Sequence, residues 1–186
     1  WNCRPYHFLT EFYADFGGYD VELTLPGRYL GKVVSTGSVE PSSPQANADG
    51  SVTYRFRADD VHDFAWTADP EALVEERPFL PEEWRDDAEE QRVADALGVM
   101  VAQVRPQPVR MILMLQPEHQ EYRERYFTAV ARSLYYFGLW YGSYPYPPIT
   151  CVDPAPAARG TGCRGGPGRW IWTCSCWGTW CARAPP

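Results

Sequence analysis

Strict alternation of apolar and polar residues is the feature that most constrains the fold of this chain. Between residues 19 and 25 every second residue is apolar, from Tyr19 to Leu25, and the residues between them are polar. Residues 51–57 repeat the pattern with Val52, Tyr54 and Phe56. A period of two is typical of a strand with one buried face. Further strands are predicted over residues 29–36 and 61–67, with a hairpin turn at Asp49-Gly50. Short strands separated by turns favour an antiparallel sheet or sandwich.

Beyond Asp69-Pro70 the pattern becomes partly helical. An acidic helix is predicted over residues 81–97 and closed by Gly98, a buried strand over 109–115, and a short strand over 149–152. Pro117 opens the clearest helix, which Gly138 closes. Its apolar stripe is expected to lie in the core. That stripe comprises Tyr122, Tyr126, Val130, Leu134 and Phe137, and the stripe of the acidic helix comprises Trp84, Ala88, Val93 and Leu97. The predicted fold class is therefore mainly β with α (α+β).

Composition excludes several classes of partner. The 186 residues are 45% apolar and carry a net charge of −7, which gives no electrostatic footprint for nucleic acid. The longest strongly apolar run, residues 111–115, is far shorter than the ~20 residues that span a bilayer. No signal peptide is visible. We therefore expect a soluble chain of unknown compartment and oligomeric state. Because residue 1 is Trp, a processed chain or a fragment is expected.

The charge changes abruptly at Asp153. All 24 acidic residues lie at or before it, and the residues after it contain four arginines and no acid. Residues 163–186 hold four of the six cysteines and four tryptophans, without periodicity. The cysteine spacing lacks the paired C-x2-C knuckles of zinc ribbons, and a disulfide framework is typical of short secreted chains. We therefore expect an unstructured tail, with a zinc site or disulfides there as less favoured alternatives. The six cysteines are Cys3, Cys151, Cys163, Cys174, Cys176 and Cys181.

A search for catalytic motifs finds none. The three histidines, His7, His62 and His119, do not form H-E-x-x-H, although His7 with Glu11 and His62 with Asp63 are possible pairs. A catalytic zinc site needs three protein ligands, and an Asp-His pair needs a nucleophile to act upon. The neighbouring carboxylates are interpreted as solvated faces; they are Asp59 with Asp60, Asp86 with Asp87, and Glu89 with Glu90. No catalytic, cofactor-binding or metal-ligating residue is therefore assigned.

Three stretches, read in order, resemble the aminopeptidase N family of zinc metallopeptidases (gluzincins). Residues 10–26, continuing to 35–37, resemble a strand pair of the family's N-terminal β-domain. Residues 61–66 are similar to the strand that leads into the catalytic domain. Residues 135–147, with their Tyr-Pro-Tyr-Pro turn, resemble the first catalytic-domain helix, and residues 149–154 the strand after it. The resemblance covers roughly residues 1–162.

The resemblance implies a domain plan. Residues 1–108 would form part of the N-terminal β-domain with an acidic helical insertion near 81–98, and residues 109–162 the start of the catalytic domain. The family then continues with a Gly-x-Met-Glu-Asn loop, which binds the substrate's amino terminus, and with H-E-x-x-H and a later Glu, which bind zinc. This sequence departs at Gly160-Thr-Gly162, where Cys163-Arg-Gly-Gly-Pro follows. No catalytic residue of the family can be carried over. The Arg-rich, Lys-poor composition suggests GC-rich coding DNA, so residues 163–186 are hypothesised to be a frameshifted continuation.

The resulting expectation is a truncated, inactive piece of a zinc-dependent aminopeptidase. Zinc and peptide substrate would belong to the full-length family and not to this chain. The alternative is a non-enzymatic β-sheet binding or interaction module, for which the 15% aromatic content is the support. In a truncated chain, the helix face of Tyr122, Tyr126 and Phe137 must either pack on the sheet or remain exposed as an apolar patch, and this predicts marginal solubility.

Overall fold

The structure is a computed structural model in which residues 16–153 are described. Its elements are a few helices and mostly antiparallel sheets, so the predicted α+β class is confirmed at that level. The described chain forms two compact units, one of residues 16–70 with 152 and 153, the other Glu71–Cys151. His7, Glu11, the tail 163–186 and every cysteine except Cys151 lie outside the described residues. Cys151 is a buried thiol and forms no disulfide.

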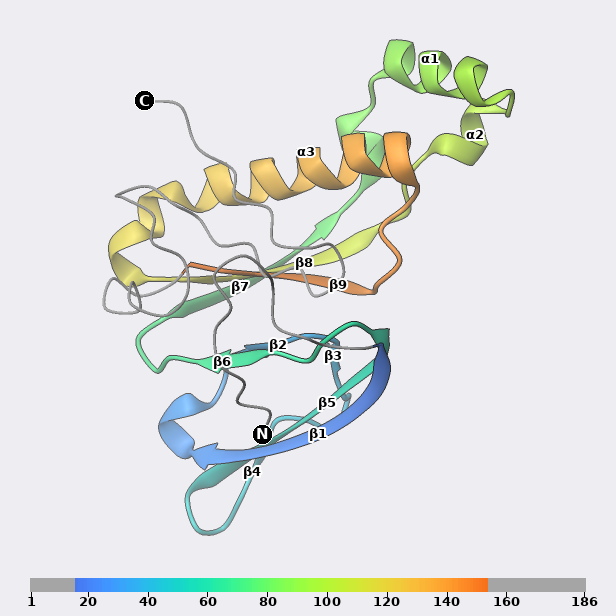
Figure 1. Ribbon diagram of the computed structural model, residues 1–186. Helices are drawn as coiled ribbons and strands as arrows, with labels where there is room; N and C mark the ends of the chain where they lie inside the picture. Colours follow the sequence, from blue (N-terminus) through green and yellow to red (C-terminus); the bar gives the residue numbers. More distant parts are fainter. Residues whose placement is uncertain (1–15, 154–186) are drawn as a thin grey trace, which may run out of the picture. The chain divides into compact units, whose positions relative to one another are not determined.

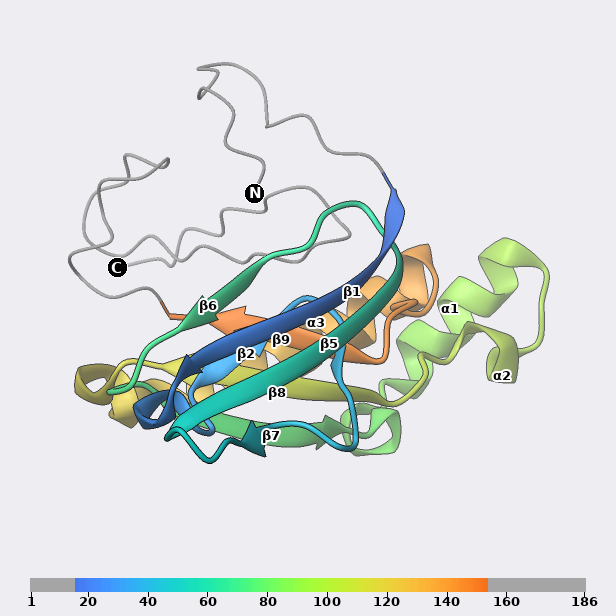
Figure 2. The same cartoon turned by 90° about the horizontal axis from the view of Figure 1, so that it is seen from below.

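The first unit is built around one long central strand. Strand β5 (Ser51–Val61) pairs antiparallel with β1 (Gly17–Pro26) along one edge. Along its other edge it pairs with two short strands, β3 (Ser38–Val39) and β4 (Gln45–Ala46). Figures 1 and 2 show β1 and β5 side by side along their whole length. The Asp49-Gly50 hairpin is confirmed between β4 and β5: Gly50 has a φ of 81° and its N–H donates to the carbonyl of Asn47.

The predicted alternation gives this unit its core. Val52, Tyr54 and Phe56 are all buried, and the apolar residues of β1 are half-buried on the same side of the sheet. Val33 completes the buried cluster from β2 (Val33–Ser35), which pairs with β6 (Trp66–Ala68). The Tyr54 hydroxyl donates to the carbonyl of Tyr29 at 2.7 Å. The predictions for these core positions of β1 and β5 are therefore confirmed.

Two strand predictions in this unit have the wrong bounds. The strand expected over residues 29–36 is only Val33–Ser35, because Gly27–Tyr29 forms a 3-10 turn (η1) and Gly31 takes a φ of 72°. The strand expected over residues 61–67 is divided. Val61 ends β5, and β6 begins only at Trp66. Asp60, with a φ of 55°, bends the chain before that break, and such a conformation interrupts a ladder.

The second unit is a sheet with a long helix beside it. The strand order is β7 (Leu73–Phe79), β8 (Val109–Leu115), β9 (Pro148–Val152), and β7 pairs antiparallel with β8. Helix α3 (Arg123–Tyr141) connects β8 to β9 and follows a 3-10 segment, η3 (Pro117–Tyr122). Because the helix returns the chain, β8 and β9 run in the same direction (Figure 1). The predicted strands at 109–115 and 149–152 are confirmed.

The helix of the acidic segment is shorter than the predicted range 81–97. The segment contains a 3-10 turn, η2 (Pro81–Trp84), then helix α1 (Asp87–Leu97) and a short helix α2 (Val101–Val104). Gly98 closes α1 in the left-handed conformation as expected. The expected stripe is wrong at Ala88 and Leu97, which are exposed; the buried face is Glu90, Val93 and Ala94. β7 and β8 pair across the domain boundary expected at residue 108.

The buried face of α3 is also displaced from the predicted stripe. Val130 and Leu134 are buried as expected, but Tyr122 and Phe137 are 40% and 48% exposed. Tyr122 precedes the regular α-helix, because residues 117–122 form the tighter 3-10 helix. Phe137 lies inside α3, at the margin of its buried face. Gly138 does not close the helix as predicted, since α3 continues to Tyr141. The face that packs in the core consists of Phe127, Val130, Ala131, Leu134, Tyr135, Gly138 and Leu139.

Candidate functional site

The most extensive polar cluster in the described chain surrounds the first turn of α1. Asp86 is the N-cap of this helix, and its carboxylate accepts a hydrogen bond from the N–H of Glu89 at 3.1 Å. This cap satisfies one of the free donors at the helix start. The cap also fixes the helix register, which places Glu90 on the face that carries Val93 and Ala94. Glu90 is consequently fully buried, with 0% of its surface exposed.

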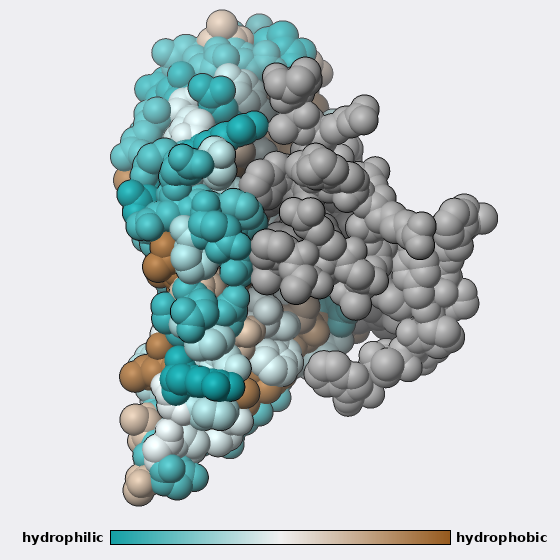
Figure 3. All heavy atoms as spheres, turned by 90° about the vertical axis from the view of Figure 1, so that its left-hand side faces the viewer, coloured by the Kyte–Doolittle hydropathy of each residue, from teal (hydrophilic) through white to brown (hydrophobic). Residues whose placement is uncertain are grey.

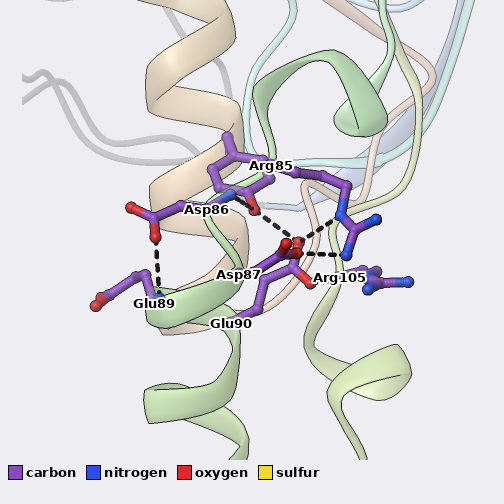
Figure 4. Close-up of polar contacts among 7 residues, drawn as sticks. Arg85, Asp86, Asp87, Glu89, Glu90 and Arg105 are labelled. Atoms are coloured by element: carbon purple, nitrogen blue, oxygen red, sulfur yellow. Dashed lines mark hydrogen bonds and ion pairs between the residues drawn. The ribbon is translucent and has the colours of Figure 1, made fainter.

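Every oxygen of the Glu90 carboxylate has a partner. One oxygen accepts a hydrogen bond from the Tyr135 hydroxyl at 2.7 Å, and the other accepts one from Nε of Arg105 at 2.8 Å. Arg85 adds a second cation, with its Nε 3.8 Å away. Tyr135 comes from α3, so the carboxylate joins three segments of the second unit. Figure 4 shows Arg85 and Arg105 converging on Glu90 beside the cap formed by Asp86.

The pKa values in this cluster follow from burial and pairing. Burial raises the pKa of Glu90, but the hydrogen bonds from Tyr135 and Arg105 and the nearby positive charges outweigh it, so the net shift is downward. Burial, together with the hydrogen bond to Glu90, raises the pKa of Tyr135 to about 12. At neutral pH Glu90 is therefore an anion and Tyr135 a donor. Neither group is available as an acid or base, and the cluster acts as a structural connection.

A second layer of contacts surrounds this cluster. Glu89 accepts hydrogen bonds from Arg92 and from the indole N–H of Trp140, each at 2.6 Å. These two donors lower the pKa of Glu89 to about 2. The Tyr136 hydroxyl donates to Asp86 at 3.3 Å. The first turn of α1 is thus fastened to the last turns of α3. The interpretation of this acidic run as a solvated face is wrong for Glu90 and Asp86, because a helix face with Val93 and Ala94 carries Glu90 inward.

A second ion-pair network ties β7 to the first turn of α3. Arg77 donates to both oxygens of Glu124, at 2.7 and 2.8 Å, and its guanidinium lies 4.2 Å from the ring centre of Phe127. Arg123 donates to Glu75 at 3.0 Å. The Arg77 hydrogen bond lowers the pKa of Glu124 to about 2. Each charge in this network faces an opposite charge, so the network also leaves no free catalytic group.

The histidines do not assemble a site in the described residues. Asp63 accepts its hydrogen bond from the N–H of Phe64 at 2.7 Å, while the His62 ring contacts Phe16 edge-on. His119 lies in η3 beside Tyr122. Within residues 16–153, no group of three metal-ligating side chains is close enough to hold a metal ion. None of the helices in that range has the length and apolar character that a bilayer crossing needs.

An exposed aromatic cluster lies at the end of α3. Phe137, Trp140 and Tyr141 are 48%, 44% and 69% exposed, and their rings contact one another with centres 6.0–6.4 Å apart. Alternating Tyr and Pro follow, with Tyr144 and Tyr146 in edge contact. On the face in Figure 3, the part that is not grey is mostly hydrophilic, with hydrophobic residues in small groups. Of the three residues of the exposed cluster, only Phe137 belonged to the stripe that the sequence spacing placed in the core.

Comparison with known proteins assigns no family. No protein-family model matches the chain, and no curated protein matches it either.

Proposed function

We propose that this chain supplies the N-terminal, non-catalytic part of a zinc-dependent aminopeptidase of the aminopeptidase N type. The observation that supports the proposal is the β8–α3–β9 unit. The segments that resemble the start of the family's catalytic domain fall on one continuous helix, its Tyr-Pro turn and the following strand. In the first unit, the end of strand β1 at Pro26 also supports the proposal. The domain plan, with a boundary near residue 108, is part of this proposal.

The proposal assigns no catalytic step to this chain. Residues 16–153 hold no group that could bind zinc, and the whole sequence lacks H-E-x-x-H. The Glu90 and Arg77 networks use their charges internally, so they serve the fold. Under the proposal, peptide hydrolysis requires the family's H-E-x-x-H zinc motif, which the sequence does not contain.

The test is an activity assay that compares the 186-residue chain with a second, frame-restored protein. The 186-residue chain is incubated with zinc and a panel of aminoacyl-arylamides, and no chelator-sensitive hydrolysis is expected. A second gene restores the reading frame after codon 162. Its product is expected to bind zinc and to release arylamine, and a chelator should stop that release. Chelator-sensitive turnover by the 186-residue chain would overturn the first part of the proposal, and an inactive, zinc-free product of the restored gene would overturn the second.

The exposed aromatic cluster favours a second candidate function, a non-enzymatic binding module. Phe137, Trp140 and Tyr141 present aromatic surface of the kind enriched at protein interfaces. Under this alternative the coding DNA ends in a natural stop with no peptidase frame beyond it, and substitution of these aromatics abolishes partner binding. Under the aminopeptidase proposal the same residues would be covered by further parts of the enzyme.

A further inference from the structure

The inference concerns the outer edge of β1. Successive residue pairs in an antiparallel ladder alternate between hydrogen-bonded and non-hydrogen-bonded pairs. The N–H of Gly27 donates to the carbonyl of Gly50, so these two residues form a hydrogen-bonded pair. The pairs formed with β5 by residues 25, 23 and 21 of β1 are therefore hydrogen-bonded as well. Leu25, Leu23 and Val21 therefore direct their backbone groups toward β5. The residues between them, Thr24, Glu22 and Asp20, direct theirs outward.

The hydrogen bonds on the other edge of β5 independently confirm which residues direct their backbone groups toward β1. The N–H of Glu40 donates to the carbonyl of Arg55, and the N–H of Asn47 donates to that of Ser51. Odd-numbered residues of β5 thus face β3 and β4, and even-numbered residues face β1. Both edges of β5 are occupied. The outward groups of Asp20, Glu22 and Thr24 have no hydrogen-bond partner within residues 16–153.

The side chains on this edge have a definite polarity. Tyr19, Val21 and Leu23 are half-buried on the core side, where the Tyr19 ring stacks on Phe64, so part of each side chain remains exposed. Asp20 and Glu22 lie on the opposite, exposed face. Glu22 pairs with Arg55 at 2.9 Å across the ladder. Arg57, opposite Asp20, bonds instead to Asp59 at 3.1 Å, so no described side chain forms a hydrogen bond with the Asp20 carboxylate.

From this geometry we propose that β1 binds an extended segment of another polypeptide in which apolar and basic residues alternate. Three outward backbone units, spaced two residues apart, are what an added strand requires. Apolar residues of the segment would cover the flanks of Tyr19, Val21 and Leu23, while its basic residues face Asp20 and Glu22. The site ends at Pro26, whose nitrogen has no hydrogen to donate. The proposal does not depend on the aminopeptidase assignment.

A second copy of this chain does not fit the same edge. β1 carries two carboxylates and no basic residue. Pairing two β1 strands would bring Asp20 and Glu22 of both copies onto one face of the joint sheet, with no cation from either strand between them. Like charges in such positions destabilise pairing.

Amide hydrogen exchange of the 186-residue chain, followed by NMR, tests the proposal. The probe is a blocked six-residue peptide that alternates valine and arginine. It is expected to slow exchange at Asp20, Glu22 and Thr24 tenfold or more and to leave Val21 and Leu23 unchanged. A valine–glutamate peptide, and the valine–arginine peptide with alternate amides N-methylated, are expected to have no effect.

One pair of protein variants and one double variant sharpen the test. Glu22→Pro removes an outward N–H without removing a β1–β5 bond and should abolish peptide protection, whereas Glu22→Gln keeps the N–H and should retain most of it. Replacing Asp20 and Glu22 together by Lys should transfer the preference to the valine–glutamate peptide, which keeps the test decisive if the proline variant does not fold.

Three results would overturn the proposal. One is slow exchange at Asp20, Glu22 and Thr24 in the peptide-free chain, whether constant or increasing with protein concentration. Another is equal binding of the arginine and glutamate peptides. The third is peptide protection that spares these three amides.

Discussion

Removing the hydroxyl of Tyr135 should weaken the second unit far more than removing that of its neighbour. In Tyr135→Phe the Glu90 carboxylate loses a donor at 2.7 Å and the N–H of Asp86 loses an acceptor at 2.8 Å, while the ring keeps its packing. One bond involves a charged, fully buried group and the other a neutral backbone group. At about 1.5 kcal/mol for the first and about 1 kcal/mol for the second, the loss should total about 2–3 kcal/mol.

The assay is equilibrium urea unfolding followed by far-ultraviolet circular dichroism, with the free energy taken from the midpoint and slope. Tyr136→Phe is the matched control, because that hydroxyl makes one longer bond, of 3.3 Å, to Asp86 at a half-exposed site. Glu90→Gln and the double variant with Tyr135→Phe complete a cycle, in which the two losses should not add. A Tyr135→Phe loss as small as that of Tyr136→Phe, or strictly additive losses, would refute the assignment of Glu90 as the anchor of α1.

Three further predictions concern the surface glutamates, Gly138 and the exposed aromatic cluster. Glu89 and Glu124 have pKa values of about 2, below the usual 4.5 of a glutamate, so their stabilisation is present above pH 4.5 and is lost as the pH falls toward 2. The urea midpoint should therefore decrease over that pH range, and Glu124→Gln should make this decrease smaller. The same dependence of the midpoint on pH in Glu124→Gln would contradict the pairing of Glu124 with Arg77. Gly138→Ala should cost about 1–2 kcal/mol of stability, because the new Cβ would lie 2.7 Å from Pro106. In thermal melts this variant should have a lower Tm than Gly18→Ala, whose Cβ has room. Equal Tm values for the two variants would count against the close contact with Pro106. Replacing both Phe137 and Tyr141 by Ser should reduce light scattering at micromolar concentration without lowering the Tm, and unchanged scattering would remove these residues as the cause of self-association.

The sequence predicted β1 and β5 well, because one face of each strand is buried and the other is exposed. As a result, apolar and polar residues alternate with a period of two over residues 19–25 and around Val52, Tyr54 and Phe56. Strand β7 gave no such signal. It carries Glu75, Glu76 and Arg77 and contains Pro78, and it forms because it pairs along the whole apolar strand β8. Such tertiary pairing is invisible in local propensity.

The polar cluster was missed for a different reason. An acidic run usually lies in solvent, and pairing consecutive acids as solvated faces ignored the helix period. Counting by helix spacing places Glu90 with Val93 and Ala94, three and four residues later, which indicates a buried carboxylate in need of a cation. Arg105 could not be identified as that cation from spacing alone, since α2 and a turn separate it from α1.

Sequencing the coding DNA beyond codon 162 tests the central proposal most directly. If the chain is the non-catalytic part of a zinc aminopeptidase, another reading frame should encode a Met-Glu-containing loop shortly after Gly162 and H-E-x-x-H farther on. Stop codons in both other frames, with neither motif, would contradict the proposal.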